Sequence, residues 1–183
     1  MPRSGAEARI RLREAALELY LENGFDATTT AQIAERAGVT ERTYFRHFAD
    51  KREVLFDGTT RLTDVMVAAI ADAPPSTAPL DLALGAYTAA IPLYVEGRPV
   101  AQRRAEVIAV TPALQERAHA KTAAISDALV AAVVGRGIPE PTARLATQVA
   151  AAAFTRAMGE WYADPTRDLG ALIARAADEV RAL

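Results

Sequence analysis

The sequence contains no cysteine, which excludes a disulfide framework and a thiolate metal site. Aromatic residues make up only 6%, and glycine and proline occur 10 times each without forming a low-complexity tract. No stretch has the roughly 18 uninterrupted apolar residues that a membrane-spanning helix needs. Residues 1–15 carry repeated charges and no apolar segment, which predicts the absence of a secretory signal. These absences favour a cytoplasmic protein without a membrane partner.

The composition that remains predicts an all-α chain. Apolar residues make up 51%, many of them alanine, and β-branched runs are few. A chain of 183 residues can bury a core as one large or two small domains. The net charge of −2 is not that of a simple basic DNA-binding protein. Residues 36–52, however, hold five Lys/Arg and two Asp/Glu, a local net charge of +3 that suits phosphate contact.

The stretch from Thr29 to Lys51 predicts two short helices joined by a tight turn. Thr29 with Gln32 three residues later forms a capping-box pattern. Gly38 supplies a stop with a positive φ, and Thr40 can cap the second helix, which extends to about residue 47. A helix, a turn containing glycine and a second short helix constitute a helix-turn-helix.

The second helix of such a unit enters the DNA major groove and presents its N-terminal residues to base edges. Arg42 is the candidate for a two-bonded contact with guanine. The remaining candidates are Glu41 and Thr43 for base edges, and Arg46, His47 and Lys51 for phosphates.

The segment AQIAERAGVTERTYFRHFADKREVLF resembles the N-terminal domain of TetR-type (tetracycline-repressor family) transcriptional regulators. The likeness covers roughly residues 8–57 and includes the HF-x-x-K signature. It implies a helix-turn-helix head of three helices, residues 1–57, and a helical body that binds a ligand and dimerises, residues 58–183. It also implies a phosphate contact for Thr30. The predicted DNA-contacting residues are Thr30, Thr40, Glu41, Arg42, Thr43, Tyr44, Arg46, His47 and Lys51.

The sequence departs from the family pattern at one position. The family usually has a Leu-Tyr pair before x-His-Phe, and the Tyr hydroxyl contacts a phosphate. Here the pair is Tyr44-Phe45, so the usual hydroxyl is missing. Either this phosphate contact is absent, or Tyr44 supplies it from a shifted angle.

Further helices are predicted along the whole chain. Residues 1–7 are expected to be a solvated tail containing Arg3, and a long helix from Asp50 is expected to reach Ile70 with an interruption at Gly58. The Pro-rich stretch 73–79 is a loop, because proline cannot continue a helix. The other predicted helices cover residues 8–23, 80–96 with a kink or break at Pro92, 99–109, 112–134, 141–163 and 166–182.

The resemblance implies a homodimer in which the last two helices of each subunit form a four-helix bundle. Two apolar stripes rich in small residues suit this role, although an intrachain core explains them equally. They comprise Leu145, Gln148, Val149, Ala152 and Ala153, and Leu169, Leu172, Ile173 and Ala176. A pocket for an unidentified small-molecule effector is expected inside the body. Its candidate lining residues are Tyr87, Tyr94, Arg103, Phe154, Met158 and Trp161.

These features predict a homodimeric, ligand-responsive transcriptional repressor that binds double-stranded operator DNA and is released by its effector. One alternative is an interaction or scaffold protein whose head no longer recognises a DNA sequence. The other is an all-α enzyme, but no motif for nucleotide, metal or nucleophilic chemistry is present. His47 and His119, the only histidines, lack paired carboxylates at ligand spacing. We therefore expect no enzymatic activity, no cofactor and no metal.

Overall fold

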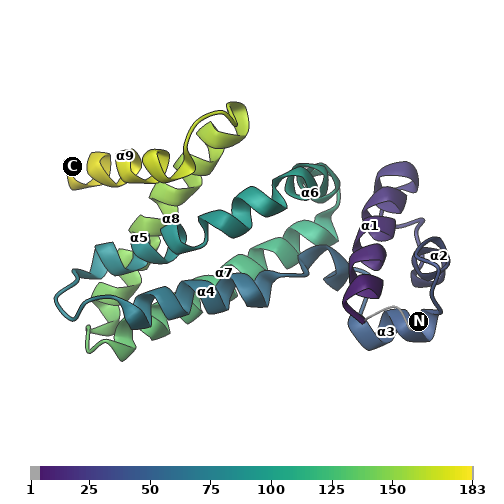
Figure 1. Cartoon of the computed structure of the whole chain (residues 1–183), viewed down its shortest axis with the longest axis horizontal. Coiled ribbons are helices and arrows are strands. Elements are labelled where there is room, and N and C mark those ends of the chain that lie inside the picture. The colour runs from purple at the N-terminus through teal and green to yellow at the C-terminus, as the bar shows by residue number, and fades with distance from the viewer. Residues whose placement is uncertain (1–4, 183) are drawn as a thin grey trace. The chain divides into compact units, whose positions relative to one another are not determined.

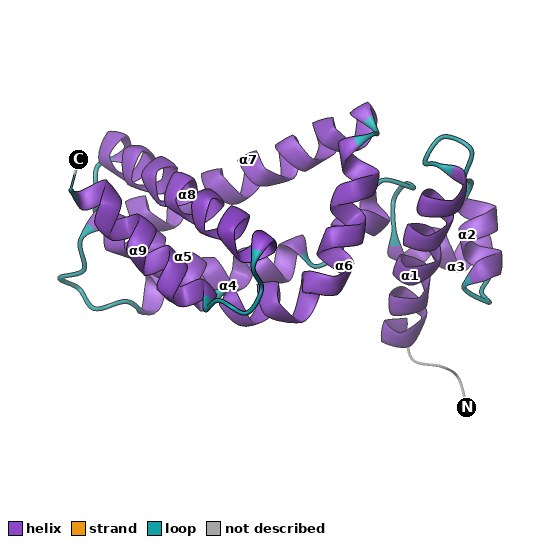
Figure 2. Cartoon of the chain, turned by 90° about the horizontal axis from the view of Figure 1, so that it is seen from above, coloured by secondary structure: helices purple, strands orange, loops and turns teal. Residues whose placement is uncertain are grey.

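The computed structural model describes residues 5–182, and these residues form nine α-helices and one 3-10 helix without a strand (Figures 1 and 2). The all-α prediction is confirmed. Residues 5–7 belong to the first helix rather than to a tail, and Arg3 lies outside the described residues. The elements are α1 Gly5–Asn23, α2 Thr30–Arg36, α3 Glu41–His47, η1 Glu53–Phe56, α4 Thr59–Asp72, α5 Pro79–Ala89, α6 Ile91–Ala109, α7 Pro112–Gly135, α8 Glu140–Ala163 and α9 Leu169–Arg181.

The chain divides into two compact units. The head unit comprises the residues up to Thr59 together with Gly97–Lys121, and the body unit comprises Thr60–Glu96 and the residues from Thr122 onward. The sequence predicts a single boundary between residues 57 and 58. The division in the structure lies close to that point, but it also assigns the end of α6 and the start of α7 to the head.

The head has its own apolar core, to which α1, α2, α3 and η1 contribute. Leu12, Ile33 and Tyr44 are fully enclosed in it. Val107 of α6 and Leu114 of α7 are buried in the same cluster. The three-helix head is therefore completed by two segments that lie far away in the sequence.

Local capping interactions fix the ends of α2 and α3. The Thr29 hydroxyl accepts a hydrogen bond from the Gln32 amide, and the Gln32 side chain accepts one from the Thr29 amide, which confirms the capping box. Gly38 has a φ of 65°, and Thr40 caps α3. The predicted helix-turn-helix geometry is thus present.

The segment after α3 differs from the predicted long helix. The Asp50 carboxylate accepts hydrogen bonds from the amides of Arg52 and Glu53, as a cap would, but only the short helix η1 follows. Asp57 is extended and Gly58 has a φ of 93°, a conformation that side chains with a Cβ avoid. The interruption expected at Gly58 is present, but the predicted α-helix does not begin at Asp50, because only the short helix η1 forms before Gly58 and α4 begins at Thr59.

In the body unit, α8 packs against both α5 and α9. The apolar core includes Leu82 of α5, Ala150 of α8 and Ile173 of α9. The last helix begins at Leu169, three residues after the predicted start, because the Asp168 carboxylate caps it through the Ala171 amide.

Helix α6 continues through Pro99, where the sequence predicts a break between two helices. Pro99 leaves the Val95 carbonyl without a backbone donor. Val95 and Pro99 are both exposed, so water can solvate that carbonyl.

Candidate nucleic-acid interface and effector region

The outward face of α3 carries the exposed side chains of Glu41, Arg42, Phe45 and Arg46. Neither Arg42 nor Arg46 has an ion-pair partner among residues 5–182. Two cations on one short helix face thus remain available for an anionic partner such as DNA phosphate or a guanine edge.

The threonines of the predicted site are engaged in local hydrogen bonds. The Thr30 hydroxyl donates to the Glu41 carboxylate at 2.5 Å, which links α2 to α3. The hydroxyls of Thr40 and Thr43 lie 3.1 Å apart, and the Thr43 amide donates to Thr40. The structure therefore brings these residues together around the N-terminus of α3.

Tyr44 does not reach the outward face of α3. Its side chain is 0% exposed, and its hydroxyl donates to the Asp50 carbonyl at 3.0 Å. Of the two alternatives for the missing hydroxyl, a contact from Tyr44 is not available in this conformation. Phe45 is 52% exposed beside Arg42 and packs edge-on against the Tyr44 ring. Phe45 follows Arg42 by three residues and Glu41 by four, so it lies on the same face of the helix as both. This spacing could have identified Phe45 as a candidate contact residue.

Three other basic residues of the 36–52 segment are engaged within the head. Arg36 pairs with Glu18 and Glu22 of α1. Arg52 pairs with Asp50 at 2.9 Å. The Lys51 ammonium donates to main-chain carbonyls of the α1–α2 turn instead of projecting outward.

His47 is only partly exposed, and its Nε2 atom is buried without a hydrogen-bond partner within the described part of the chain. Burial lowers its pKa, and the neighbouring cations Arg46 and Arg9 lower it further. A neutral His47 is thus favoured in the free head, and its phosphate contact stays a prediction.

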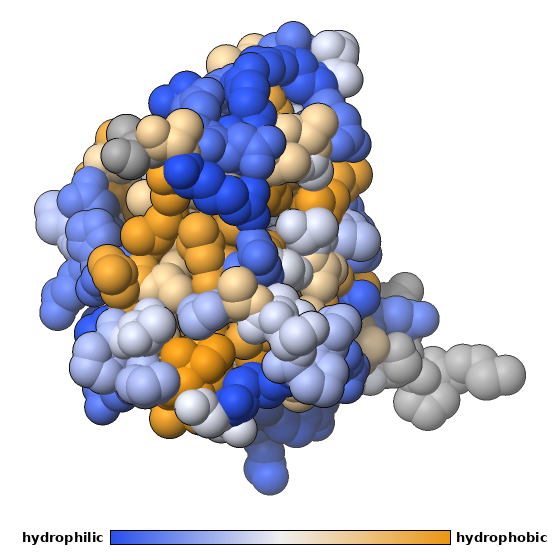
Figure 3. Space-filling model, turned by 90° about the vertical axis from the view of Figure 1, so that its left-hand side faces the viewer, coloured by the Kyte–Doolittle hydropathy of each residue, from blue (hydrophilic) through white to orange (hydrophobic). Residues whose placement is uncertain are grey.

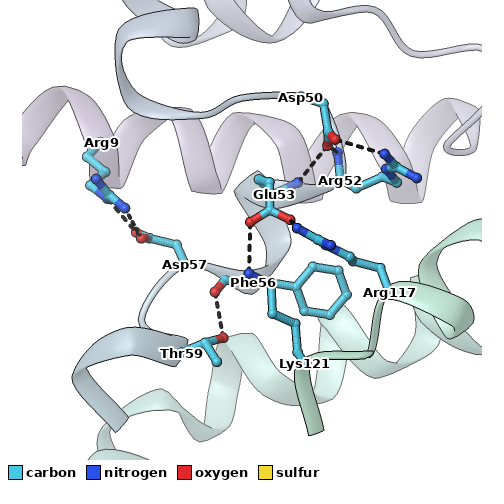
Figure 4. Close-up of polar contacts among 9 residues, drawn as sticks. All are labelled: Arg9, Asp50, Arg52, Glu53, Phe56, Asp57, Thr59, Arg117 and Lys121. Atoms are coloured by element: carbon cyan, nitrogen blue, oxygen red, sulfur yellow. Dashed lines mark hydrogen bonds and ion pairs between the residues drawn. The ribbon is translucent and has the colours of Figure 1, made fainter. Parts of the chain in front are cut away.

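A second polar cluster of the head surrounds η1 (Figure 4). Glu53 pairs with Arg117 and with Lys121, one turn apart on α7; the Lys121 Nζ lies 2.9 Å from its carboxylate. Burial acts to raise the pKa of Glu53, but hydrogen bonds from Lys121 and Arg117 outweigh this effect and lower it. The Arg104 guanidinium donates to the Leu55 carbonyl at 3.2 Å. No local sequence pattern indicates this cluster, because 64 residues separate Glu53 from Arg117.

Three of the residues predicted to line the effector pocket form an aromatic cluster in the body. The Tyr87 and Phe154 rings stack with their centroids 4.5 Å apart, and Tyr94 lies 4.9 Å from Phe154. Met158 and Trp161 are buried in the body core. Arg103 instead belongs to the head unit and is exposed, so it is not part of this cluster. Effector contact by these residues stays a prediction.

The two predicted dimerisation stripes have different surroundings. On α9 all four stripe residues are buried in the body core, as the intrachain alternative predicts. On α8, Ala153 is buried, but Leu145 is 62% exposed, and Gln148 and Ala152 are also exposed. Hydrophobic residues also reach the body surface that Figure 3 shows, where they lie between hydrophilic ones.

Within residues 5–182, no helix is long and apolar enough to cross a membrane. The same range has no cluster of three or more His, Asp or Glu side chains that could hold a metal ion.

Two family models match the chain: bacterial regulatory proteins of the TetR family over residues 12–57, and the MftR C-terminal domain of TetR-type proteins over residues 77–183. The HTH-type transcriptional regulator TcmR of Streptomyces glaucescens is 40% identical over 83 residues, which cover 45% of this chain and 37% of TcmR. The chain thus matches only about a third of that relative's length.

Solved structures share the fold over nearly the whole chain. The fatty acid degradation regulator FadR of Bacillus halodurans has a TM-score of 0.58 and 16% identity, covering 92% of each chain. FadR of Thermus thermophilus, a repressor solved with lauroyl-CoA, has a TM-score of 0.50 and 21% identity, covering 93% of this chain and 91% of its own. The matched proteins are transcriptional regulators and not enzymes. From the two matching family models, the chain belongs to the TetR family of bacterial transcriptional regulators.

Proposed function

We propose that this chain is a transcriptional repressor that binds operator DNA as a homodimer through α3 and is released by a small-molecule effector. The observation that carries the proposal is the outward face of α3. Arg42 and Arg46 stand there exposed and without ion-pair partners among the described residues. Such cations are available for the phosphates and guanine edges of a major groove.

The chemistry of this face also suggests how bases are recognised. Arg42 near the N-terminus of α3 can bind the O6 and N7 atoms of guanine. Glu41 beside it can accept a hydrogen bond from the N4 amino group of cytosine and would repel a phosphate. A half-site that contains G·C pairs fits these two side chains better than one composed only of A·T pairs.

The test is fluorescence anisotropy with DNA from upstream of the coding region and with scrambled DNA, at two salt concentrations. We expect selective binding by the wild type and a loss of roughly 30-fold or more for Arg42→Ala, because a dimer loses two base contacts of about 1–3 kcal/mol each. Arg61→Ala, which removes an exposed arginine of the body outside α3 and α8, is the matched control and should bind normally. Equal binding of both DNAs by the wild type would favour the scaffold alternative.

Dimerisation is supported by the exposed side of α8. Leu145, Gln148 and Ala152 are exposed along it at helical spacing, and an exposed leucine on such a face suits a contact with a second copy. A dimer would also supply two heads for half-sites about 34–36 Å apart. Leu145→Glu should shift sedimentation towards the monomer, whereas Val110→Glu, at another exposed apolar position, should not. A wild type that sediments as a monomer at micromolar concentration would refute this part.

Effector binding is supported by the aromatic cluster of Tyr87, Tyr94 and Phe154 in the body. A ligand that binds one conformation of the body better than another would shift the population away from the DNA-binding form. Trp161, the only tryptophan, is buried in the same core and provides a fluorescence signal for screening. A compound that changes this signal should also release DNA in the anisotropy assay. Compounds that change the signal without releasing DNA would contradict the effector role.

A further inference from the structure

The ammonium group of Lys51 is surrounded by acceptors of its own chain. Its Nζ donates to the carbonyls of Phe25 at 2.9 Å and Thr28 at 3.2 Å, and lies 3.5 Å from the Asp26 carbonyl. The Phe25 ring centroid lies 4.2 Å from the same atom, within cation–π distance. An ammonium has three donors and no acceptor, so these three carbonyls account for all of its hydrogen-bonding capacity.

The main chain at Lys51 is held as firmly as its side chain. The Tyr20 hydroxyl of α1 donates to the Lys51 carbonyl at 2.5 Å, and the Tyr44 hydroxyl of α3 donates to the preceding carbonyl of Asp50. Burial raises the pKa of both tyrosines, so each hydroxyl keeps the proton that it donates. The segment after α3 is therefore tied to α1, to α3 and to the α1–α2 turn.

From these contacts we infer that Lys51 is a positioning residue, which fastens the α1–α2 turn to the end of the recognition helix, and that it is not a phosphate ligand. The turn from Phe25 to Thr28 leads directly into α2, so the clamp holds α2 and α3 in their relative positions. This departs from the phosphate contact predicted for Lys51 from the sequence. The effect on DNA binding rests on the proposed function, whereas the clamp itself does not.

The geometry explains why phosphate binding is disfavoured. To reach a phosphate, the ammonium would have to give up its hydrogen bonds to the carbonyls of Phe25, Asp26 and Thr28. It would also lose its cation–π contact with the Phe25 ring. Leaving partly buried carbonyls without a hydrogen-bond donor costs free energy. The only gain would be a single solvent-exposed ion pair, which contributes little. Lys51 therefore serves DNA binding through the position of α3, and not through its own charge.

The test compares Lys51→Met, which keeps the aliphatic stem, with Arg46→Met, which removes an exposed cation of α3. For Lys51→Met we expect a melting temperature on the order of 5 °C lower. Faster hydrogen exchange over residues 24–29 should accompany it. At 15 °C, where the variant remains folded, selective DNA binding should weaken roughly tenfold, because α3 is misplaced. The slope of log K against log salt should stay unchanged.

Arg46→Met should give the opposite pattern. Its melting temperature should stay near that of the wild type, and its salt slope should become shallower by about 1.8, the loss of one phosphate contact per protomer of a dimer. A shallower slope for Lys51→Met as well would identify Lys51 as a phosphate ligand and overturn the inference. A lower melting temperature with unchanged selective binding would also overturn it, since the role would then be only structural.

Failure of the proposed function is distinguishable from failure of this inference. If the wild type binds no DNA selectively, the DNA-binding proposal fails, and the exchange measurement alone decides whether Lys51 is a clamp. Unchanged exchange over residues 24–29 in Lys51→Met would then overturn the clamp.

Discussion

Replacing Leu114 by alanine tests whether the start of α7 is part of the head. The Leu114 side chain is 0% exposed and lies in the head core with Leu12 and Tyr44. Deleting a fully enclosed leucine removes its burial and leaves a cavity, at a total cost of about 3–4 kcal/mol. Backbone amides that exchange only when the whole head unfolds should therefore exchange roughly 100-fold faster or more.

The matched control is Leu129→Ala, because Leu129 lies on the same helix and is equally buried, but in the body core. Hydrogen exchange with mass spectrometry resolves the two regions. Leu114→Ala should accelerate exchange in α1 and α3, whereas Leu129→Ala should do so in α5 and α8. If Leu114→Ala left α1 and α3 fully protected, the assignment of Leu114 to the head core would be refuted.

Three further substitutions test individual contacts of the head. Glu53→Gln should destabilise it by about 1 kcal/mol at pH 7, because it weakens both ion pairs; urea titration should show this difference. Since the folded-state pKa of Glu53 is lowered, its contribution is complete above the ordinary value near 4.3 and lost as pH falls below it. The difference between the variant and the wild type should therefore shrink as pH falls below that value, and a constant difference would contradict the argument. Thr29→Ala removes the capping box and should cost about 1 kcal/mol, seen as faster exchange in α2. Phe45→Tyr places a hydroxyl on the exposed ring and should tighten operator binding a few-fold by anisotropy. Unchanged affinity would contradict a position of this ring next to a phosphate.

Features that depend on neighbouring residues were predictable from the sequence. The capping box of Thr29 and Gln32, the positive φ of Gly38 and the Thr40 cap each involve residues within four positions, so the pattern contains the whole interaction. The same holds for Pro112, which begins α7 as predicted. The resemblance to the TetR family also predicted that these helices together form one head.

Features that depend on distant residues were not predictable. The pairing of Glu53 with α7 joins positions more than 60 residues apart, and no local pattern indicates it. Lys51 is the lysine of the HF-x-x-K family signature. Only the folded α1–α2 turn shows that main-chain carbonyls accept the hydrogen bonds of its ammonium group. The apolar stripe of α9 is a further example. The spacing of its apolar residues predicts a buried face, but it does not show which helix covers that face.

The charge of the proposed DNA-binding surface cannot be obtained by counting residues in the sequence. The sequence count over residues 36–52 includes five cations, but Arg36 and Arg52 pair with carboxylates at the surface of the head, and Lys51 donates to main-chain carbonyls. Arg42 and Arg46 remain without such partners among the described residues, so a dimer would present four of these cations. Each phosphate contact contributes about −0.9 to the slope of log K against log salt, so we expect a slope of about −3.6 or shallower. A slope twice as steep would mean that further cations contact phosphate, and would refute this account of the surface. With so little electrostatic attraction, affinity for the operator has to come mainly from base contacts, and binding to unrelated DNA should be weak.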